Sequence, residues 1–188
     1  MITLQACPIL ISFVLAAAST PIIKGFVNDY KKWSAVQNER ASKEKSEDID
    51  TAHEIVKKQQ IACNRMTKGV ELLKKDPVIR KSFAIANEAM LLQMKHSGIK
   101  SPSWRPFQLG FILLALESTI NEDSEFRDTL DLIWFPTGGG KTEAYLGLMA
   151  LLFAYRRLKY RNSSGGTVAI MRYTLRLLST QQFLRATK

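Results

Sequence analysis

Apolar residues recur every three or four positions along the first half of the chain, which is the spacing of one face of an α-helix. Phe26, Tyr30 and Trp33 follow this spacing and precede a charged run at residues 38–50. We therefore expect an amphipathic helix over residues 24–48 that runs into a solvated connector.

The same spacing predicts two further helices. One ends near residues 74–75, and its apolar stripe is Ile55, Ala62, Met66, Val70 and Leu73. Asp76 and Pro77 then suit the N-cap and first position of a third helix, because proline has no N–H to leave unpaired there. Gly98 is the expected C-cap of that helix, and its stripe is Ile79, Phe83, Ala86, Met90 and Met94.

The second half of the chain has a different pattern. Two prolines place residues 99–106 in a loop, which suggests a boundary near residue 100 between a helical region (1–100) and a second unit (101–188). An apolar helix is expected at 107–118, an acidic loop at 119–128, and helices at about 142–158 and 175–186.

Two short, continuous apolar runs, 130–135 and 167–171, have the length and composition of buried parallel strands. With the intervening glycine loop and helix, they predict the order strand, loop, helix, strand, helix, which begins a parallel α/β sheet. The expected fold class is therefore α/β and mostly helical. These two strands need not be neighbours in a sheet, and their apolar faces would then lack cover.

The stretch between these strands contains the candidate chemistry. Gly138, Gly139 and Gly140 let backbone N–H groups approach a phosphate closely, and the helix that follows adds its positive end. Lys141 is placed to reach the β- and γ-phosphates, and the Thr142 hydroxyl to bind Mg²⁺. The predicted ligands are ATP and Mg²⁺, bound by residues 137–142, including Thr137. The alternative is an ordinary glycine-rich turn before a helix.

Charge supports an anionic partner. The net charge is +10, and residues 141–188 contain nine basic residues against a single acidic one, Glu143. Cys7 and Cys63 form no metal or disulfide pattern, so a reducing cytoplasm is expected. The uncharged start of the chain, residues 1–23, suggests either a membrane anchor or signal, or a buried core segment; Pro8 and its limited length favour the core.

Residues 134–148 (WFPTGGGKTEAYLGL), with 104–113 and 171–186 on either side, resemble superfamily-two helicases, and most closely the DrmA-type helicase-like proteins of the DISARM phage-defence system. Phe135 stands where the general phosphate-loop pattern has glycine, a departure that helicase loops tolerate. The resemblance implies an incomplete RecA-like ATPase lobe over 101–188. It also implies that Gln108 reads the adenine edge, beside Phe107 or Arg105; alternatively, Gln108 is a solvated residue at a helix start.

The resemblance further implies that Thr174 and Arg176 contact a DNA backbone, although a plain surface helix would also fit these residues. ATP hydrolysis in such enzymes requires an acidic box and a second motor lobe, yet no Asp or Glu follows Glu143. We expect the ATP-binding part of a DNA helicase or translocase that needs a second polypeptide to hydrolyse ATP. The alternatives are a non-catalytic nucleotide- or DNA-binding fragment and a membrane-anchored ATPase.

Overall fold

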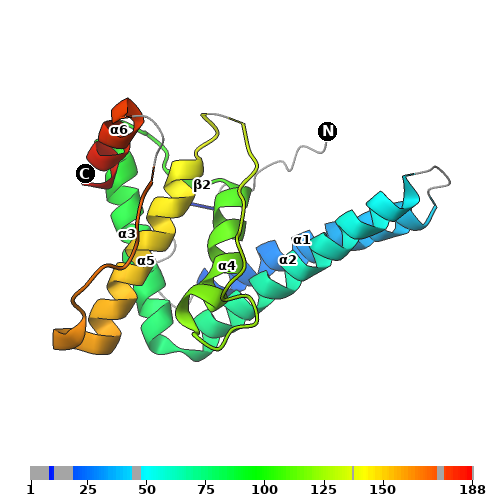
Figure 1. Cartoon of the computed structure of the whole chain (residues 1–188), viewed down its shortest axis with the longest axis horizontal. Coiled ribbons are helices and arrows are strands. Elements are labelled where there is room, and N and C mark those ends of the chain that lie inside the picture. The colour runs from blue at the N-terminus through cyan, green and yellow to red at the C-terminus, as the bar shows by residue number, and fades with distance from the viewer. Residues whose placement is uncertain (1–8, 11–18, 44–47, 137, 173–175, 188) are drawn as a thin grey trace.

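A computed structural model describes residues 9–10, 19–43, 48–136, 138–172 and 176–187 of the chain. Most of these residues are helical, as predicted. Helices α1 (Ser19–Ser42) and α2 (Ile49–Lys75) lie side by side as a hairpin that projects from the rest of the molecule (Figure 1).

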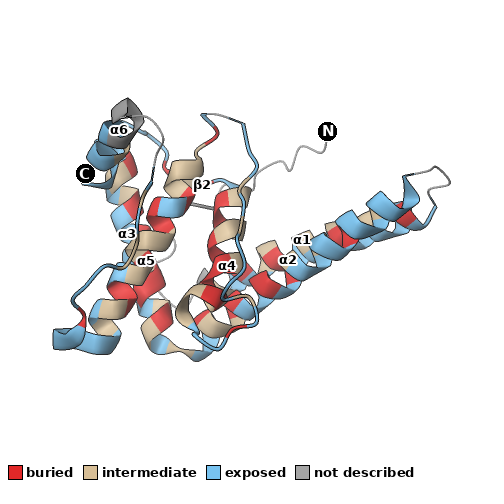
Figure 2. Ribbon diagram, viewed as in Figure 1, coloured by how far each residue is buried: buried red, intermediate tan, exposed pale blue. Residues whose placement is uncertain are grey.

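The other helices form the body of the protein. Helix α3 (Pro77–His96) packs along α5 (Lys141–Tyr160), and α4 (Pro106–Ile120) contacts both α2 and α5. A short 3-10 turn, η2 (Arg161–Ser163), follows α5, and α6 (Arg176–Ala186) lies near the C-terminus. Buried positions concentrate where α2, α3, α4 and α5 face one another (Figure 2).

The predicted helix boundaries are confirmed where their signals were specific. The Asp76 carboxylate accepts hydrogen bonds from the N–H groups of Val78 and Ile79, at 2.7 and 3.1 Å, and so caps α3. Gly98 has a φ of +83°, the conformation that follows a helix end. The predicted stripe of α3 is buried throughout. In α2 the stripe begins one residue late, because Val56 is buried while Ile55 is 51% exposed.

Glycines permit two close approaches between elements. A Cβ added to Gly69 on α2 would lie 2.2 Å from the carbonyl oxygen of Leu113 on α4, so glycine allows these two helices to touch. A Cβ on Gly147 of α5 would lie 2.6 Å from the Trp104 ring. The first contact sets the spacing of α2 and α4, and the second lets α5 pack closely against Trp104.

The two predicted parallel strands are wrong. Residues 130–135 and 167–171 have no regular secondary structure, and Leu130, Trp134 and Ile170 are 92%, 91% and 86% exposed. A parallel strand is stable when neighbouring strands satisfy its backbone groups, and the described residues place no strand beside either segment. The described strands are instead β1 (Ile9–Leu10) and β2 (Ser103–Trp104), an antiparallel pair of two residues each.

Within the described residues, no helix combines the length and the apolar character that crossing a membrane requires. Most of the apolar start of the chain, including residues 11–18, lies outside the described residues. The described parts of this start are Ile9 and Leu10, which pair with Trp104 and Ser103 in the small sheet, and residues 19–23, which begin α1. The choice between an anchor and a core segment at the start of the chain therefore stays a prediction.

Candidate functional site

The glycine loop bends sharply just before α5. Gly138 and Gly140 have φ values of +78° and +86°, which side chains other than glycine rarely adopt. The N–H of Gly139 donates to the carbonyl of Pro136 at 3.1 Å, closing a tight turn. A Cβ on Gly139 would lie 2.4 Å from the Phe135 ring. Each of the three glycines is therefore either in the left-handed region or too closely packed for a side chain.

Helix α5 begins directly after this turn. Gly140 occupies the N-cap position and offers no side chain to bond the first-turn N–H groups, so these donors and the positive end of the helix dipole remain available to an anion. The Lys141 ammonium folds back over the loop, where it donates to the carbonyl oxygens of Phe135 and, at 3.2 Å, Pro136. The loop thus gathers backbone donors and a cation at one helix end.

Two side chains from the start of α4 form hydrogen bonds with the glycine loop. The Arg105 guanidinium donates to the Gly139 carbonyl at 2.7 Å, and the Gln108 amide donates to the Gly140 carbonyl at 2.7 Å. Gln108 is only 3% exposed, and its amide oxygen accepts the N–H of Arg105 at 2.8 Å. These two bonds satisfy the carbonyl groups of Gly139 and Gly140.

The residues predicted to lie beside an adenine base make contacts within the protein. The Gln108 side chain is bonded at both its amide nitrogen and its oxygen. The Phe107 ring stacks on the Phe135 ring, with centroids 4.1 Å apart and planes inclined by 17°. These contacts fix Phe135, which stands at the departure from the general phosphate-loop pattern. The role of Gln108 in reading a base stays a prediction.

A cavity of about 640 Å³ opens against the loop, a size typical of sites for small ligands. It brings together Gln108 and the described residues of the predicted phosphate site, Gly138, Gly139, Gly140, Lys141 and Thr142. The lining residues come from the end of α3, the loop after it, the start of α4, the glycine loop, the start of α5, and α6: Met94, Ile99, Ser101, Ser103, Arg105, Gln108, Gly138, Gly139, Gly140, Lys141, Thr142, Glu143, Gln182 and Arg185.

An ion pair forms the far wall of this cavity. Arg185 on α6 donates to one carboxylate oxygen of Glu143 at 2.7 Å. The other carboxylate oxygen of Glu143 and the amide oxygen of Gln182 are buried and have no hydrogen-bond partner among the described residues. The carboxylate lies directly after the Lys-Thr pair, so Arg185 neutralises a negative charge that would otherwise repel a bound anion.

Sequence reasoning did not single out Glu143, Gln182 or Arg185 as site residues. The sequence did contain a signal for an ion pair at Glu143. Glu143 is the single acidic residue among the last 48, and nine basic residues in the same stretch could pair with it. The predicted site residues Thr137 and Thr174 lie outside the described residues. Arg176 is the first residue of α6, and its role in DNA contact stays a prediction.

Comparison with known proteins finds a relative of this chain. The chain is 36% identical to the DISARM protein DrmA of Bacillus paralicheniformis over an aligned length of 182 residues, and the alignment covers 85% of this chain. The chain is DrmA-like. The match spans 16% of the length of DrmA, so the DrmA-like sequence corresponds to a limited part of that protein. No protein-family model matches the chain.

Proposed function

We propose that this chain is the ATP-binding part of a DrmA-like helicase or translocase ATPase that acts in phage defence. One observation carries the proposal: Gly138–Gly140, Lys141 and Thr142 line a single cavity at the uncapped N-terminal end of α5. A nucleoside triphosphate with Mg²⁺ is bound by groups of this kind: converging backbone donors, a cation and a hydroxyl at a helix start. The phage-defence role is supported by the similarity to the DISARM protein DrmA.

The residues present fit Mg·ATP. The left-handed turns at Gly138 and Gly140 expose backbone N–H groups that would bond the phosphate oxygens, and Lys141 would contribute charge. The Thr142 hydroxyl would coordinate Mg²⁺, which prefers oxygen ligands and shares them with the phosphates. When bound, Mg²⁺ would neutralise part of the triphosphate charge.

DNA is the proposed polymer partner. The excess of basic residues over residues 141–188 supports it, and Thr174 and Arg176 would contact the phosphate backbone. Other subunits of the defence system, including a polypeptide that supplies the remaining motor elements, are the proposed protein partners. The 188 residues contain no Asp or Glu after Glu143, so we propose that the chain by itself binds ATP without hydrolysing it.

The test is equilibrium binding of Mg·ATP to the purified chain, to Lys141→Ala, and to a matched control, Lys159→Ala. Both lysines lie on α5, but Lys159 is at the opposite end and donates to the Tyr155 hydroxyl. We expect the parent and Lys159→Ala to bind, and Lys141→Ala to lose binding. Failure of the parent to bind would reject the proposal, as would equal binding by both variants. DNA-stimulated turnover by the chain alone would reject the part that concerns hydrolysis.

A further inference from the structure

The polypeptide that enters the glycine loop is held by few contacts. Residues 130–135 form no backbone–backbone hydrogen bonds with other described residues, and the Phe135 carbonyl accepts from the Lys141 side chain. Side chains hold this segment at two points: Asp131 at its start bonds to Arg65 of α2, and Phe135 at its end stacks on Phe107. We call residues 131–135 the entry segment.

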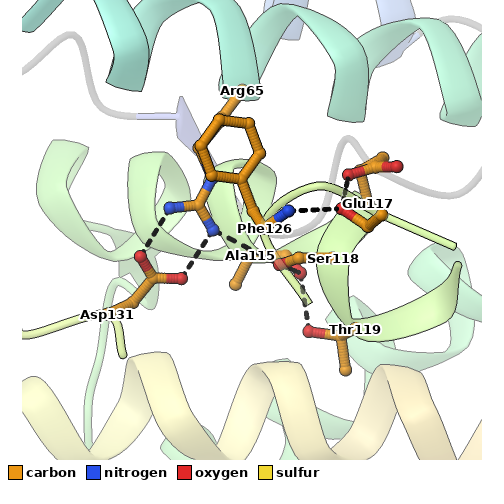
Figure 3. Close-up of polar contacts among 8 residues, drawn as sticks. Arg65, Ala115, Glu117, Ser118, Thr119, Phe126 and Asp131 are labelled. Carbon is orange, nitrogen blue, oxygen red and sulfur yellow. Dashed lines mark hydrogen bonds and ion pairs between the residues drawn. The ribbon is translucent and has the colours of Figure 1, made fainter. Parts of the chain in front are cut away.

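Arg65 holds Asp131 in a defined geometry (Figure 3). Its two terminal nitrogens donate to the two carboxylate oxygens at 2.6 and 2.7 Å, which makes the pair bidentate. One of these nitrogens also donates to the Ser118 hydroxyl of α4 at 3.3 Å, and the guanidinium lies 4.6 Å from the centre of the Phe126 ring. The Arg65 guanidinium is thus also held by contacts with α4 and with the loop after α4.

The entry segment is short. Asp131 lies beside Ser118 near the end of α4, and Phe135 lies beside Phe107 near its start, so the segment runs back along this helix (Figure 1). The eleven helical steps from Phe107 to Ser118 rise about 16 Å. The four steps from Asp131 to Phe135 span at most about 14 Å, and the side chains cover the remainder. Because only four residue steps separate the two held side chains, we expect a displacement of Asp131 to reach the glycine loop.

The cost of burying Arg65 argues against a role in stability alone. Arg65 is 5% exposed on the otherwise apolar buried face of α2. Removing a guanidinium from water costs several kcal/mol, and apolar side chains of similar volume often stabilise such positions equally well. What an apolar residue cannot supply is the bidentate, directional hold on a carboxylate.

We infer that Arg65 is a positioning residue for the phosphate-binding loop: by holding Asp131 it sets where the chain enters the turn at Gly138–Gly140. This inference rests on the proposed nucleotide-binding function. It assigns to the α1–α2 hairpin, through one side chain of α2, control over the geometry of the candidate site.

Arg65→Lys and Asp131→Asn test the inference, with Lys68→Met as a matched control. Lysine retains the charge but cannot make the bidentate pair. Lys68 lies one turn further along α2, also faces the Phe126 ring, and pairs with the exposed Glu125. For each variant we would measure Mg·ATP affinity, urea unfolding and amide hydrogen exchange at residues 138–142.

We expect Arg65→Lys and Asp131→Asn to weaken Mg·ATP binding about tenfold or more and to speed hydrogen exchange in the glycine loop. Both variants disturb a buried ion pair and should lower the unfolding midpoint, but exchange in α3 and α5 should rise less than exchange in the glycine loop. Lys68→Met should behave as the parent. Binding and loop exchange within twofold of the parent would overturn the inference. A uniform loss of protection across α3 and α5 would also overturn it, because Arg65 would then be purely structural.

The exchange measurement separates this inference from the proposed function, because it needs no ligand. If the parent fails to bind ATP but Arg65→Lys still loosens the loop selectively, the proposed function is rejected and the positioning role stands. If the parent binds ATP and the loop is unaffected by Arg65→Lys, the positioning role is rejected and the proposed function stands.

Discussion

Substituting Gly69 by alanine is expected to destabilise the protein, although alanine favours helices. A Cβ at this position would lie 2.2 Å from the Leu113 carbonyl oxygen and 3.1 Å from its carbon, whereas ordinary contacts begin at 3.4 Å. The obstruction is backbone of α4, which cannot rotate away as a side chain would, so α2 and α4 must separate by about 1 Å. Overpacking of this kind typically costs about 1–3 kcal/mol, and we expect the upper end.

Gly25→Ala is the matched control. Gly25 lies inside α1, and a Cβ there would meet nothing within 4 Å. Both substitutions gain the same helix propensity, roughly 1 kcal/mol, so this term cancels when the two variants are compared. Gly25→Ala should therefore stabilise the protein by up to about 1 kcal/mol, Gly69→Ala should destabilise it by about 2 kcal/mol, and the difference of about 3 kcal/mol is the cost of the contact.

The assay is urea unfolding of the parent and both variants, with free energies from linear extrapolation. If Gly69→Ala is as stable as Gly25→Ala, the close crossing of α2 and α4 does not exist in solution. An equal loss of unfolding free energy in both variants would also contradict the reasoning, because it would mean that a Cβ at Gly25 meets a neighbouring atom in solution.

Two further predictions concern pH and the exposed segment. Burial alone would raise the pKa of Glu117, but hydrogen bonds from Ser124 and Asn121 and nearby positive charges hold this pKa below the ordinary 4.5. Its stabilising contribution is therefore complete above that value and lost as the pH falls through the lower folded-state pKa; the free energy of unfolding of Glu117→Gln should accordingly fall less steeply in acid than that of the parent. Replacing Leu132 and Trp134, 76% and 91% exposed, with serine should leave the unfolding free energy within about 0.5 kcal/mol and reduce aggregation measured by light scattering. A larger loss would mean that these side chains are packed in solution.

Local signals in the sequence predicted the helices well. The pairing of Asp76 with Pro77, the glycine after α3 and the apolar stripe of that helix each act within a few residues, so no distant partner can override them. The glycine loop is also predicted by a local signal, because its turn and the start of α5 depend on Gly138–Gly140 themselves. The sequence also placed Gln108 near this loop, through resemblance rather than through spacing.

Long-range features were harder to predict. An apolar run such as 130–135 indicates a buried strand, but burial requires neighbouring strands that no local pattern supplies. The pair of Arg65 with Asp131 joins residues 66 positions apart. Its signal was a charged residue on the buried face of α2, between Ala62 and Gly69, and that signal suggests a partner without identifying it. The pair of Glu143 with Arg185 is of the same kind.

The hairpin of α1 and α2 has the dimensions of a lever arm. From the crossing at Gly69 to the start of α2 at Ile49 there are twenty residues, or about 30 Å of helix. A rotation of about 10° at this fulcrum would move the far end by about 5 Å while shifting residues near the crossing by less than about 1 Å. Arg65 lies one turn from the crossing at Gly69. A force applied at the far end of the hairpin would therefore reach the entry segment as a smaller displacement with a larger force.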